Sequence, residues 1–207
     1  MCMKKAFVGC ALGLALFAMG CQNSNAPVAV DPPPSTDHLP EVENPRYAHW
    51  SQFPVGTKVV RYKEVTNKNG TVYVTTTYEV TEVSDERAVV SQQVSVKRPE
   101  GDTENPPQDL EFIAKFRLPE TVKLEDYALP SPKAKLVGTE TREFCGRTAE
   151  AERYEWVEMN EAGPMSVILC LSNRVPGQLL REDTLIERDG DTSLETVISI
   201  EIPEDKA

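Results

Sequence analysis

Apolar and polar residues alternate along most of the chain beyond residue 56. Every second position is apolar or β-branched in four stretches, 72–80, 88–96, 165–171 and 194–202. A period of two puts successive side chains on opposite faces of an extended strand, so each stretch predicts a strand with one buried face. Including weaker alternation elsewhere, the predicted strands are 57–66, 71–82, 87–98, 109–117, 139–146, 149–158, 165–172, 178–188 and 192–202.

Turn-forming residues separate these strands at hairpin-like intervals. Asn67 to Gly70, Ser84 to Glu86, Asn160 to Pro164 and Asp189-Gly190 each supply residues that favour tight turns. Strands and helices do not alternate as a parallel sheet requires. The sequence therefore predicts a mostly β fold: a curved antiparallel meander sheet, forming an open or half barrel, because about nine strands in one sheet curl strongly.

Three segments depart from the alternation. Asn44-Pro45 can cap a short N-terminal helix that carries Trp50. We expect the polar segment from Pro99 to Gln108 to be a mobile loop. The segment 118–138 mixes prolines with apolar residues, and two readings stay open for it: a flap over one end of the sheet, or an irregular crossover.

The first residues have the pattern of an export signal. Lys4 and Lys5 precede a mostly apolar run from Ala6 to Met19, too short for a membrane-spanning helix. The stretch Phe17 to Cys21 resembles the lipobox of bacterial lipoproteins. The resemblance implies cleavage between Gly20 and Cys21, and acylation of Cys21 with fatty acids such as palmitate, which would anchor the chain firmly.

The same resemblance implies a location. Gln22 after the acylated cysteine favours the outer membrane, facing the periplasm or the cell surface. Residues 22–46 carry six prolines and hardly any large apolar side chain, which is typical of an unpacked tether. The predicted organisation is a signal peptide over 1–20, an acylated cysteine and disordered tether over 21–46, and a β domain over 47–207.

Composition narrows the function classes. The chain has 207 residues with 33 acidic against 22 basic side chains, a formal charge of -11. Such a charge argues against nucleic-acid binding and against a polybasic membrane patch, since both need a basic surface.

Catalytic and metal-binding signatures are missing from the sequence. It has no HExxH, P-loop or GxGxxG motif, and His49 is the single histidine of the predicted β domain. His38 belongs to the tether. Asp189-Gly190-Asp191 lacks the calcium-loop spacing and suits a hairpin turn. We expect no enzyme activity, no metal and no cofactor; a hydrolase using paired carboxylates is the least favoured alternative.

Cys145 and Cys170 are the two cysteines of the β domain. Exported proteins commonly pair such residues, which favours a disulfide. However, a predicted strand at 149–158 lies between them and Cys170 faces away from Val167 and Leu169, which favours two separate thiols. Both alternatives stay open.

Two further stretches resemble a group of uncharacterised bacterial lipoproteins. They are Trp50-Ser51-Gln52-Phe53-Pro54-Val55-Gly56-Thr57 and Leu171-Ser172-Asn173-Arg174-Val175-Pro176-Gly177, and relatives often have a second glycine at the position of Gln178. The predicted architecture is also similar to the LolA/LolB-type half-barrels that carry or receive lipoproteins.

This second resemblance implies a binding surface on the concave face. Its lining would include Tyr62, Tyr78, Tyr154 and Trp156; the alternative is that these aromatics fill the core. The leading hypothesis is a non-enzymatic, membrane-anchored lipoprotein that binds a hydrophobic ligand or another envelope protein. The second hypothesis is a structural or assembly component of the envelope without a small ligand.

Overall fold

The computed structural model describes residues 39–118, 122–127, 129–186 and 190–203. Gly20, Cys21 and the predicted signal peptide lie outside these residues, as does most of the predicted tether. The described residues belong to one compact unit that spans 36–207. Among them, no helix is long and apolar enough to cross a membrane.

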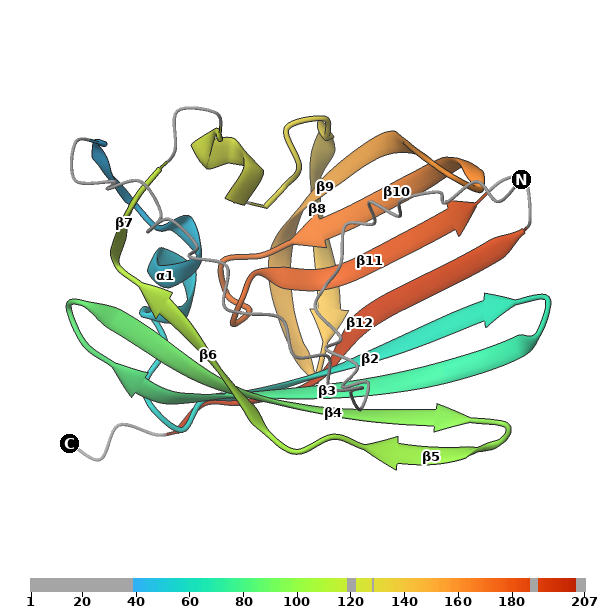
Figure 1. Ribbon diagram of the computed structural model, residues 1–207, viewed down its shortest axis with the longest axis horizontal. Coiled ribbons are helices and arrows are strands. Elements are labelled where there is room, and N and C mark those ends of the chain that lie inside the picture. The colour runs from blue at the N-terminus through green and yellow to red at the C-terminus, as the bar shows by residue number, and fades with distance from the viewer. Residues whose placement is uncertain (1–38, 119–121, 128, 187–189, 204–207) are drawn as a thin grey trace, which may run out of the picture. The chain divides into compact units, whose positions relative to one another are not determined.

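Antiparallel strands make up most of the described part of the chain, as the alternation predicts. Their bounds are β1 Glu41–Glu43, β2 Lys58–Asn67, β3 Gly70–Val83, β4 Arg87–Arg98, β5 Gly101–Glu104, β6 Gln108–Ile113, β7 Lys115–Arg117, β8 Lys135–Phe144, β9 Arg147–Asn160, β10 Gly163–Leu171, β11 Leu179–Ile186 and β12 Asp191–Glu201. The prediction of a curved, open antiparallel sheet with a short N-terminal helix is confirmed (Figure 1).

The connectivity differs from a simple meander. Within the described residues the strand order is β5-β4-β3-β2-β12-β11-β10-β9-β8, with β6 also pairing with β4. Two runs of consecutive hairpins are thus joined in the middle by β2 and β12. Hairpin signals predict neighbours that are close in sequence, so they could not reveal this long-range pair. We call β2 to β6 the N-terminal half and β8 to β11 the C-terminal half; β12 lies between them in Figure 1.

The edge of the N-terminal half is more elaborate than predicted. The segment expected to be a mobile loop contains β5, which pairs with the second part of β4, while β6 pairs with the first part. The predicted strand 109–117 is interrupted at Ala114, whose N–H donates to Glu86 O and whose carbonyl accepts from Asn44 N. Beyond Ala114 the chain leaves β4, and β7 pairs with β1.

The helix α1, Pro45–Trp50, begins where the sequence predicts. The Asn44 side-chain oxygen accepts hydrogen bonds from the N–H groups of Arg46 and Tyr47, as expected of an N-cap, and Pro45 occupies the first turn. Because β1 and Asn44 are ordered, the folded part includes residues 41–46, which the sequence assigned to the tether. The pairing of β1 with β7 supplies the backbone partners that the tether prediction did not foresee.

Between β7 and β8 the chain crosses from one half of the sheet to the other. The described part of this segment contains a short 3-10 helix, η1, Leu124–Tyr127. The backbone carbonyl of Tyr127 accepts a hydrogen bond from Arg46 Nε, and its ring lies 5.2 Å from that of Phe116. The segment is therefore fastened near α1 and β7.

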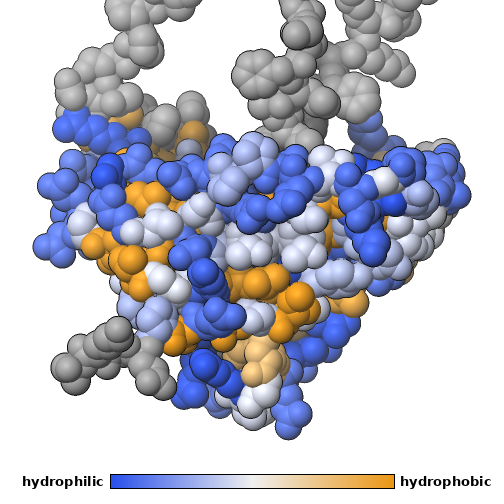
Figure 2. Space-filling view, turned by 90° about the horizontal axis from the view of Figure 1, so that it is seen from below, coloured by the Kyte–Doolittle hydropathy of each residue, from blue (hydrophilic) through white to orange (hydrophobic). Residues whose placement is uncertain are grey.

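The main core lies where α1 packs on the sheet. Trp50 stacks on Phe112 and contacts Tyr78, with ring centroids 6.2 and 5.8 Å away. A second cluster lies on the C-terminal half, where Leu169, Leu171 and Leu179 are buried with Tyr154 and Trp156 packed against them. On the face seen from below, Figure 2 shows hydrophobic residues gathered near the middle among mostly hydrophilic ones.

Candidate ligand-binding site

We call the sheet face that α1 covers at one end the inner face. Residues opposite one another in an antiparallel pair share a face, so the register traces this face across the sheet. One unbroken row joins the two halves: Val96, Val74, Lys63, Glu195, Glu182, Leu169, Tyr154 and Leu136. The inner face therefore has charged side chains at its centre and apolar ones on both sides.

The two sequence stretches that resemble lipoproteins meet on this face. Trp50 comes from the first, and Gly177 from the second lies so close that a Cβ built on it would be 2.7 Å from the Trp50 ring and 2.8 Å from Arg61 Nη2. The buried Arg61 donates to the carbonyls of Pro176 and Gly177 at 3.2 and 3.4 Å and lies 5.0 Å from the Tyr78 ring centroid. Both stretches thus have structural roles: they fasten the 172–178 loop to α1 and β2.

Gln178 explains one detail of that resemblance. Its φ is +62°, in the left-handed region where glycine is favoured, which suits the glycine that the resemblance leads us to expect there. Here the buried Gln178 side chain donates through Nε2 to Asn173 Oδ1 at 3.1 Å. The 172–178 loop keeps its shape although the residue is not glycine.

An open hollow of about 530 Å³ lies between the β8–β9 hairpin, the 172–178 loop and Leu129-Pro130. We call it the polar hollow. Its lining combines carboxylates, hydroxyls and amides with a few apolar side chains: Leu129, Pro130, Thr139, Thr141, Thr148, Ala149, Glu150, Glu152, Tyr154, Leu171, Asn173, Arg174 and Gln178. Its volume is in the range of sites for small molecules.

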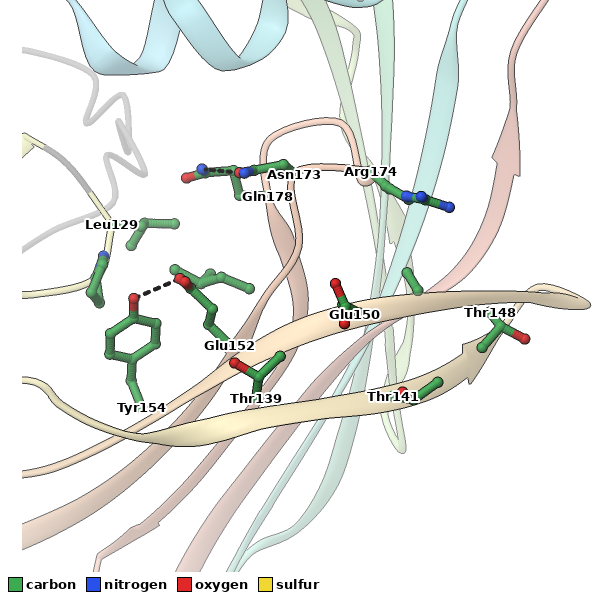
Figure 3. Close-up of a pocket in the computed structure, with 13 residues that line it drawn as sticks. Leu129, Thr139, Thr141, Thr148, Glu150, Glu152, Tyr154, Asn173, Arg174 and Gln178 are labelled. Carbon is green, nitrogen blue, oxygen red and sulfur yellow. Dashed lines mark hydrogen bonds between the residues drawn. The ribbon is translucent and has the colours of Figure 1, made fainter.

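Figure 3 shows how the polar groups are distributed in this hollow. At one end the Tyr154 hydroxyl donates to Glu152 Oε2 at 2.7 Å. Burial and this carboxylate together raise the pKa of Tyr154 to about 12. Glu150 lies farther along β9, and Arg174 extends from the loop at the other end. The Tyr154 phenol thus stays neutral at physiological pH and holds one carboxylate in place.

A second hollow of about 490 Å³ adjoins the first, and the two share Thr148 and Arg174. Its lining is Phe53, Phe144, Arg147, Thr148, Arg174 and Ile202. We call it the seam hollow, because it lies where the curl of the sheet brings the end of β8 near the end of β12. At this seam the Ile200 backbone hydrogen-bonds the Cys145 thiol.

The charged centre of the inner face contains a carboxylate with a raised pKa, Glu182. Lys63 Nζ and Glu195 Oε2 form an ion pair at 3.4 Å. Burial raises the pKa of Glu182, and Glu195 raises it further, while Lys63 and Arg61 lower it. Desolvation outweighs the cations here, so Glu182 holds its proton more tightly than an exposed glutamate.

The structure brings only two of the four predicted lining residues together, Tyr154 and Trp156, which pack against the same cluster. Tyr154 lines the polar hollow, Trp156 packs against the neighbouring cluster, and Tyr78 lies under α1, where its hydroxyl accepts from Gln92. Tyr62 lies on the opposite face, stacked on Tyr73 at 5.8 Å. Its placement on the concave face was wrong: inner positions of β2 include Arg61 and Lys63, so apolar alternation did not reveal the phase of this strand.

The structure contains Cys145 and Cys170 as free thiols, the second of the two alternatives. Cys170 lies opposite Arg153, which lies opposite Gly138, whereas Cys145 is at the far end of β8. Seven residues of strand correspond to roughly 23 Å, far beyond disulfide reach. The buried Cys170 instead donates to Glu140 Oε1 at 3.4 Å.

The remaining chemical candidates gain no partners among the described residues. Burial lowers the pKa of His49, whose neighbourhood is α1 rather than either hollow. No group of three or more His, Cys, Asp or Glu side chains in this part of the chain is arranged to hold a metal ion. Asp189 lies outside the described residues.

The sequence did not predict that Glu152, Arg174 and Arg147 line a hollow. The two hollows form between segments that are distant in the sequence and share no local pattern.

Comparisons with known proteins yield structural neighbours but no family. No protein-family model and no curated protein matches the chain. Its fold is similar to that of a candidate lipoprotein from Parabacteroides distasonis, with 13% identity and a TM-score of 0.41, over 72% of this chain and 97% of that one. It is also similar to MucB in complex with MucA(peri), with 14% identity and a TM-score of 0.39, over 78% of this chain and 56% of MucB.

A third neighbour is a candidate outer membrane lipoprotein-sorting protein domain from Vibrio parahaemolyticus. The identity is 8% and the TM-score 0.28, over 78% of this chain and 91% of that one. At these identities and TM-scores the likeness is one of general fold.

Proposed function

We propose that this protein is an exported lipoprotein, anchored through acylated Cys21 to the outer membrane, whose β domain binds a small amphipathic ligand without catalysing a reaction. The observation that carries the binding part is the polar hollow: about 530 Å³, open, and positioned on the inner face. A filled inner face would have favoured a purely structural component. The lipobox-like stretch ending at Gly20-Cys21 supports the anchoring part.

The residues that line the polar hollow indicate what kind of ligand it can bind. A wholly hydrophobic ligand would remove water from Glu150 and Arg174 without giving them partners, at a cost of several kcal/mol for a desolvated charge. An amphipathic ligand can place polar groups on β9 and apolar groups on Leu129 and Leu171. This arrangement favours a binding protein, because the Tyr154 hydroxyl that bonds Glu152 has its pKa raised rather than lowered, which makes it a poor nucleophile.

Native mass spectrometry of the full chain extracted from bacterial membranes tests the binding. We expect a bound species on the wild-type protein that disappears in Thr139→Trp, because the indole fills the polar hollow. The matched control is Thr77→Trp, on the opposite face of β3, which should retain the bound species. A wild-type protein without any bound species, or one retained in Thr139→Trp, would count against the proposal.

Labelling with radioactive palmitate tests the anchor independently. The label should appear on the wild-type chain and be lost in Cys21→Ala. Cys145→Ala is the control, because it removes a thiol from the β domain and should leave labelling intact. Labelling that survives Cys21→Ala would refute acylation at this residue.

A second candidate function is an assembly component that pairs its sheet edge with another envelope protein. The specific observation is β8, which pairs with β9 on one side and with no other strand among the described residues. Leu136 and Val137 near its start are 51% and 54% exposed. Free strand edges accept extended segments of partner proteins by β-strand addition. The variant Thr141→Pro should abolish such pairing, because proline has no backbone N–H to donate to a partner strand. The control variant Thr77→Trp should leave the pairing intact.

A further inference from the structure

We propose that the seam hollow is a separate binding site for a single-chain anionic amphiphile, with the apolar chain against Phe53, Phe144 and Ile202 and the anionic head group held by Arg147 and Arg174. The proposal concerns a different hollow from the one that carries the proposed function. It does not depend on acylation of the protein or on occupancy of the polar hollow.

The walls of the seam hollow are suited to a hydrocarbon chain. Phe53 follows α1, Phe144 ends β8 and Ile202 follows β12, so three distant segments each contribute one large apolar side chain. Ile202 is 37% exposed. Phe53 is only 8% exposed and belongs to the main core, so Ile202 and the partly buried Phe144 supply the apolar surface that a ligand can cover.

The fold explains why part of this apolar surface is not already covered. The curl brings β8 close to β12, but the two strands do not pair, because β9, β10 and β11 lie between them in the sheet. The Ile200 residue of β12 is paired with Val59 of β2, and its backbone hydrogen-bonds the Cys145 thiol that follows β8. The seam therefore lacks the close packing that a strand pair would give, and a ligand can complete it.

The two arginines define the ligand's charge. Among the described residues, neither Arg147 nor Arg174 forms an ion pair, although acidic residues outnumber basic ones in the chain. Four other arginines of the sheet do bind carboxylates, in the pairs Arg87–Glu82, Arg142–Glu140, Arg153–Glu155 and Arg181–Asp183. Arg147 and Arg174 thus present guanidinium groups with free donors beside an apolar wall.

Guanidinium geometry selects the head group. The planar fork binds carboxylate and phosphate oxygens with two parallel hydrogen bonds, and Thr148 adds a hydroxyl at the same rim. A volume of about 490 Å³ suits one short chain rather than several long ones. The shared chemistry is therefore an acid group on a single aliphatic chain, as in a fatty acid or an alkyl phosphate.

Isothermal titration calorimetry tests this site with four ten-carbon probes: decanoate, decyl phosphate, decanol and decylammonium. The protein is the full chain held in phosphatidylcholine nanodiscs, with the heat of empty nanodiscs subtracted. Decanoate or decyl phosphate should bind at least tenfold more tightly than decanol and decylammonium. The tighter of the two anions identifies the head group as a carboxylate or a phosphate ester.

Single substitutions locate the site. Arg147→Gln and Arg174→Gln should each weaken binding of the anion by about tenfold to a hundredfold, the usual effect of losing hydrogen bonds to a charged group. Arg98→Gln, at the end of β4, is the matched control and should leave the affinity unchanged. All three arginines are exposed, so the variants should keep the melting temperature of the wild type.

The outcomes separate this site from the polar hollow. Thr139→Trp should leave anion binding intact, because Thr139 lines the polar hollow alone. Equal affinity for decanol and decanoate, unchanged affinity in Arg147→Gln, or no binding of any probe would overturn the proposal. Loss of binding in Thr139→Trp together with unchanged binding in Arg147→Gln would assign the ligand to the polar hollow instead.

Discussion

The two halves of the sheet share one inner face and one alternating pattern, yet they differ in what covers that face. On the N-terminal half, α1 packs Trp50 against Tyr78 and Phe112. On the C-terminal half, Tyr154 and Glu152 border an open hollow. In strands with clear alternation the pattern thus indicates which side points inward, but a covering helix decides whether that side becomes core or binding surface.

The two tryptophans provide the largest test of this difference. Trp50 is 6% exposed within the main core, whereas Trp156 packs only partly against the second cluster. Trp50→Ala should lower the free energy of unfolding by about 3–5 kcal/mol, as for other buried aromatic side chains, and Trp156→Ala by less than half of that. Urea denaturation measures both. Equal losses would mean that the C-terminal half is covered as fully as the N-terminal half.

Two glycines with the same backbone angle test the fastening of the 172–178 loop. Gly177 and Gly146 both have φ +69°, but only Gly177 has atoms within 3 Å of a built Cβ, while Gly146 has none within 4 Å. Gly146→Ala should cost about 1–2 kcal/mol of unfolding free energy for the left-handed backbone alone. Gly177→Ala should cost about 1–3 kcal/mol more, because Trp50 and Arg61 must move. Similar losses in the two variants would show that the contact is relieved without cost.

The pH dependence of stability tests the environment of Glu182, which lies in the row of inner-face residues that joins the two halves. Its pKa is raised above the ordinary 4.5, so the folded state binds the proton more tightly than the unfolded state. The stabilising effect of the protonated carboxyl is present below pH 4.5 and is lost as the pH rises through the folded-state pKa. Glu182→Gln should therefore gain stability relative to wild type as the pH rises, by less than the glycine effects. Thermal unfolding between pH 4 and 8 measures the gain, and a constant difference would contradict it.

The smallest expected effects come from two tyrosine hydroxyls, one in each half. Tyr154→Phe removes the hydrogen bond to Glu152, and Tyr78→Phe the one from Gln92. Each should cost at most about 1.5 kcal/mol of unfolding free energy, with the covered Tyr78 losing more. In addition, Tyr154→Phe should remove the phenol that ionises near pH 12, which absorbance at 295 nm detects. A larger loss for Tyr154 would indicate a tightly packed hollow.

Much of the fold could be predicted, because its information is local. Alternation located β3, β4, β10 and β12 closely, and Asn44-Pro45 located α1. The phase of β2 was hidden, since Arg61 and Lys63 occupy inner positions that a pattern of apolar residues leaves unread. The pairing of β2 with β12 depends on contacts between residues such as Lys63 and Glu195, 132 positions apart.

The binding sites were less predictable, because each one joins residues that are distant in the sequence. The polar hollow takes residues from the crossover segment, β8, β9 and the 172–178 loop, and the seam hollow joins Phe53 to Phe144 and Ile202. No single stretch of sequence contains either constellation. Tyr154 was identified because it is an aromatic residue in an alternating strand, whereas Arg147 and Arg174 have no distinguishing neighbours in the sequence.

The pairing of β2 with β12 also has a consequence for how the chain acquires its fold. As the polypeptide emerges from a ribosome or an export channel, β2, β3 and β4 can pair early, but one edge of β2 has no partner until β12 begins to appear at Asp191. The pairing of β2 with β12 closes a loop that places Lys63 and Glu195, 132 positions apart, side by side. Closing so long a loop is entropically costly and slows folding. Until then the β2 edge can pair with other chains. We therefore expect truncated chains that lack β12 to aggregate rather than to form a stable half-domain.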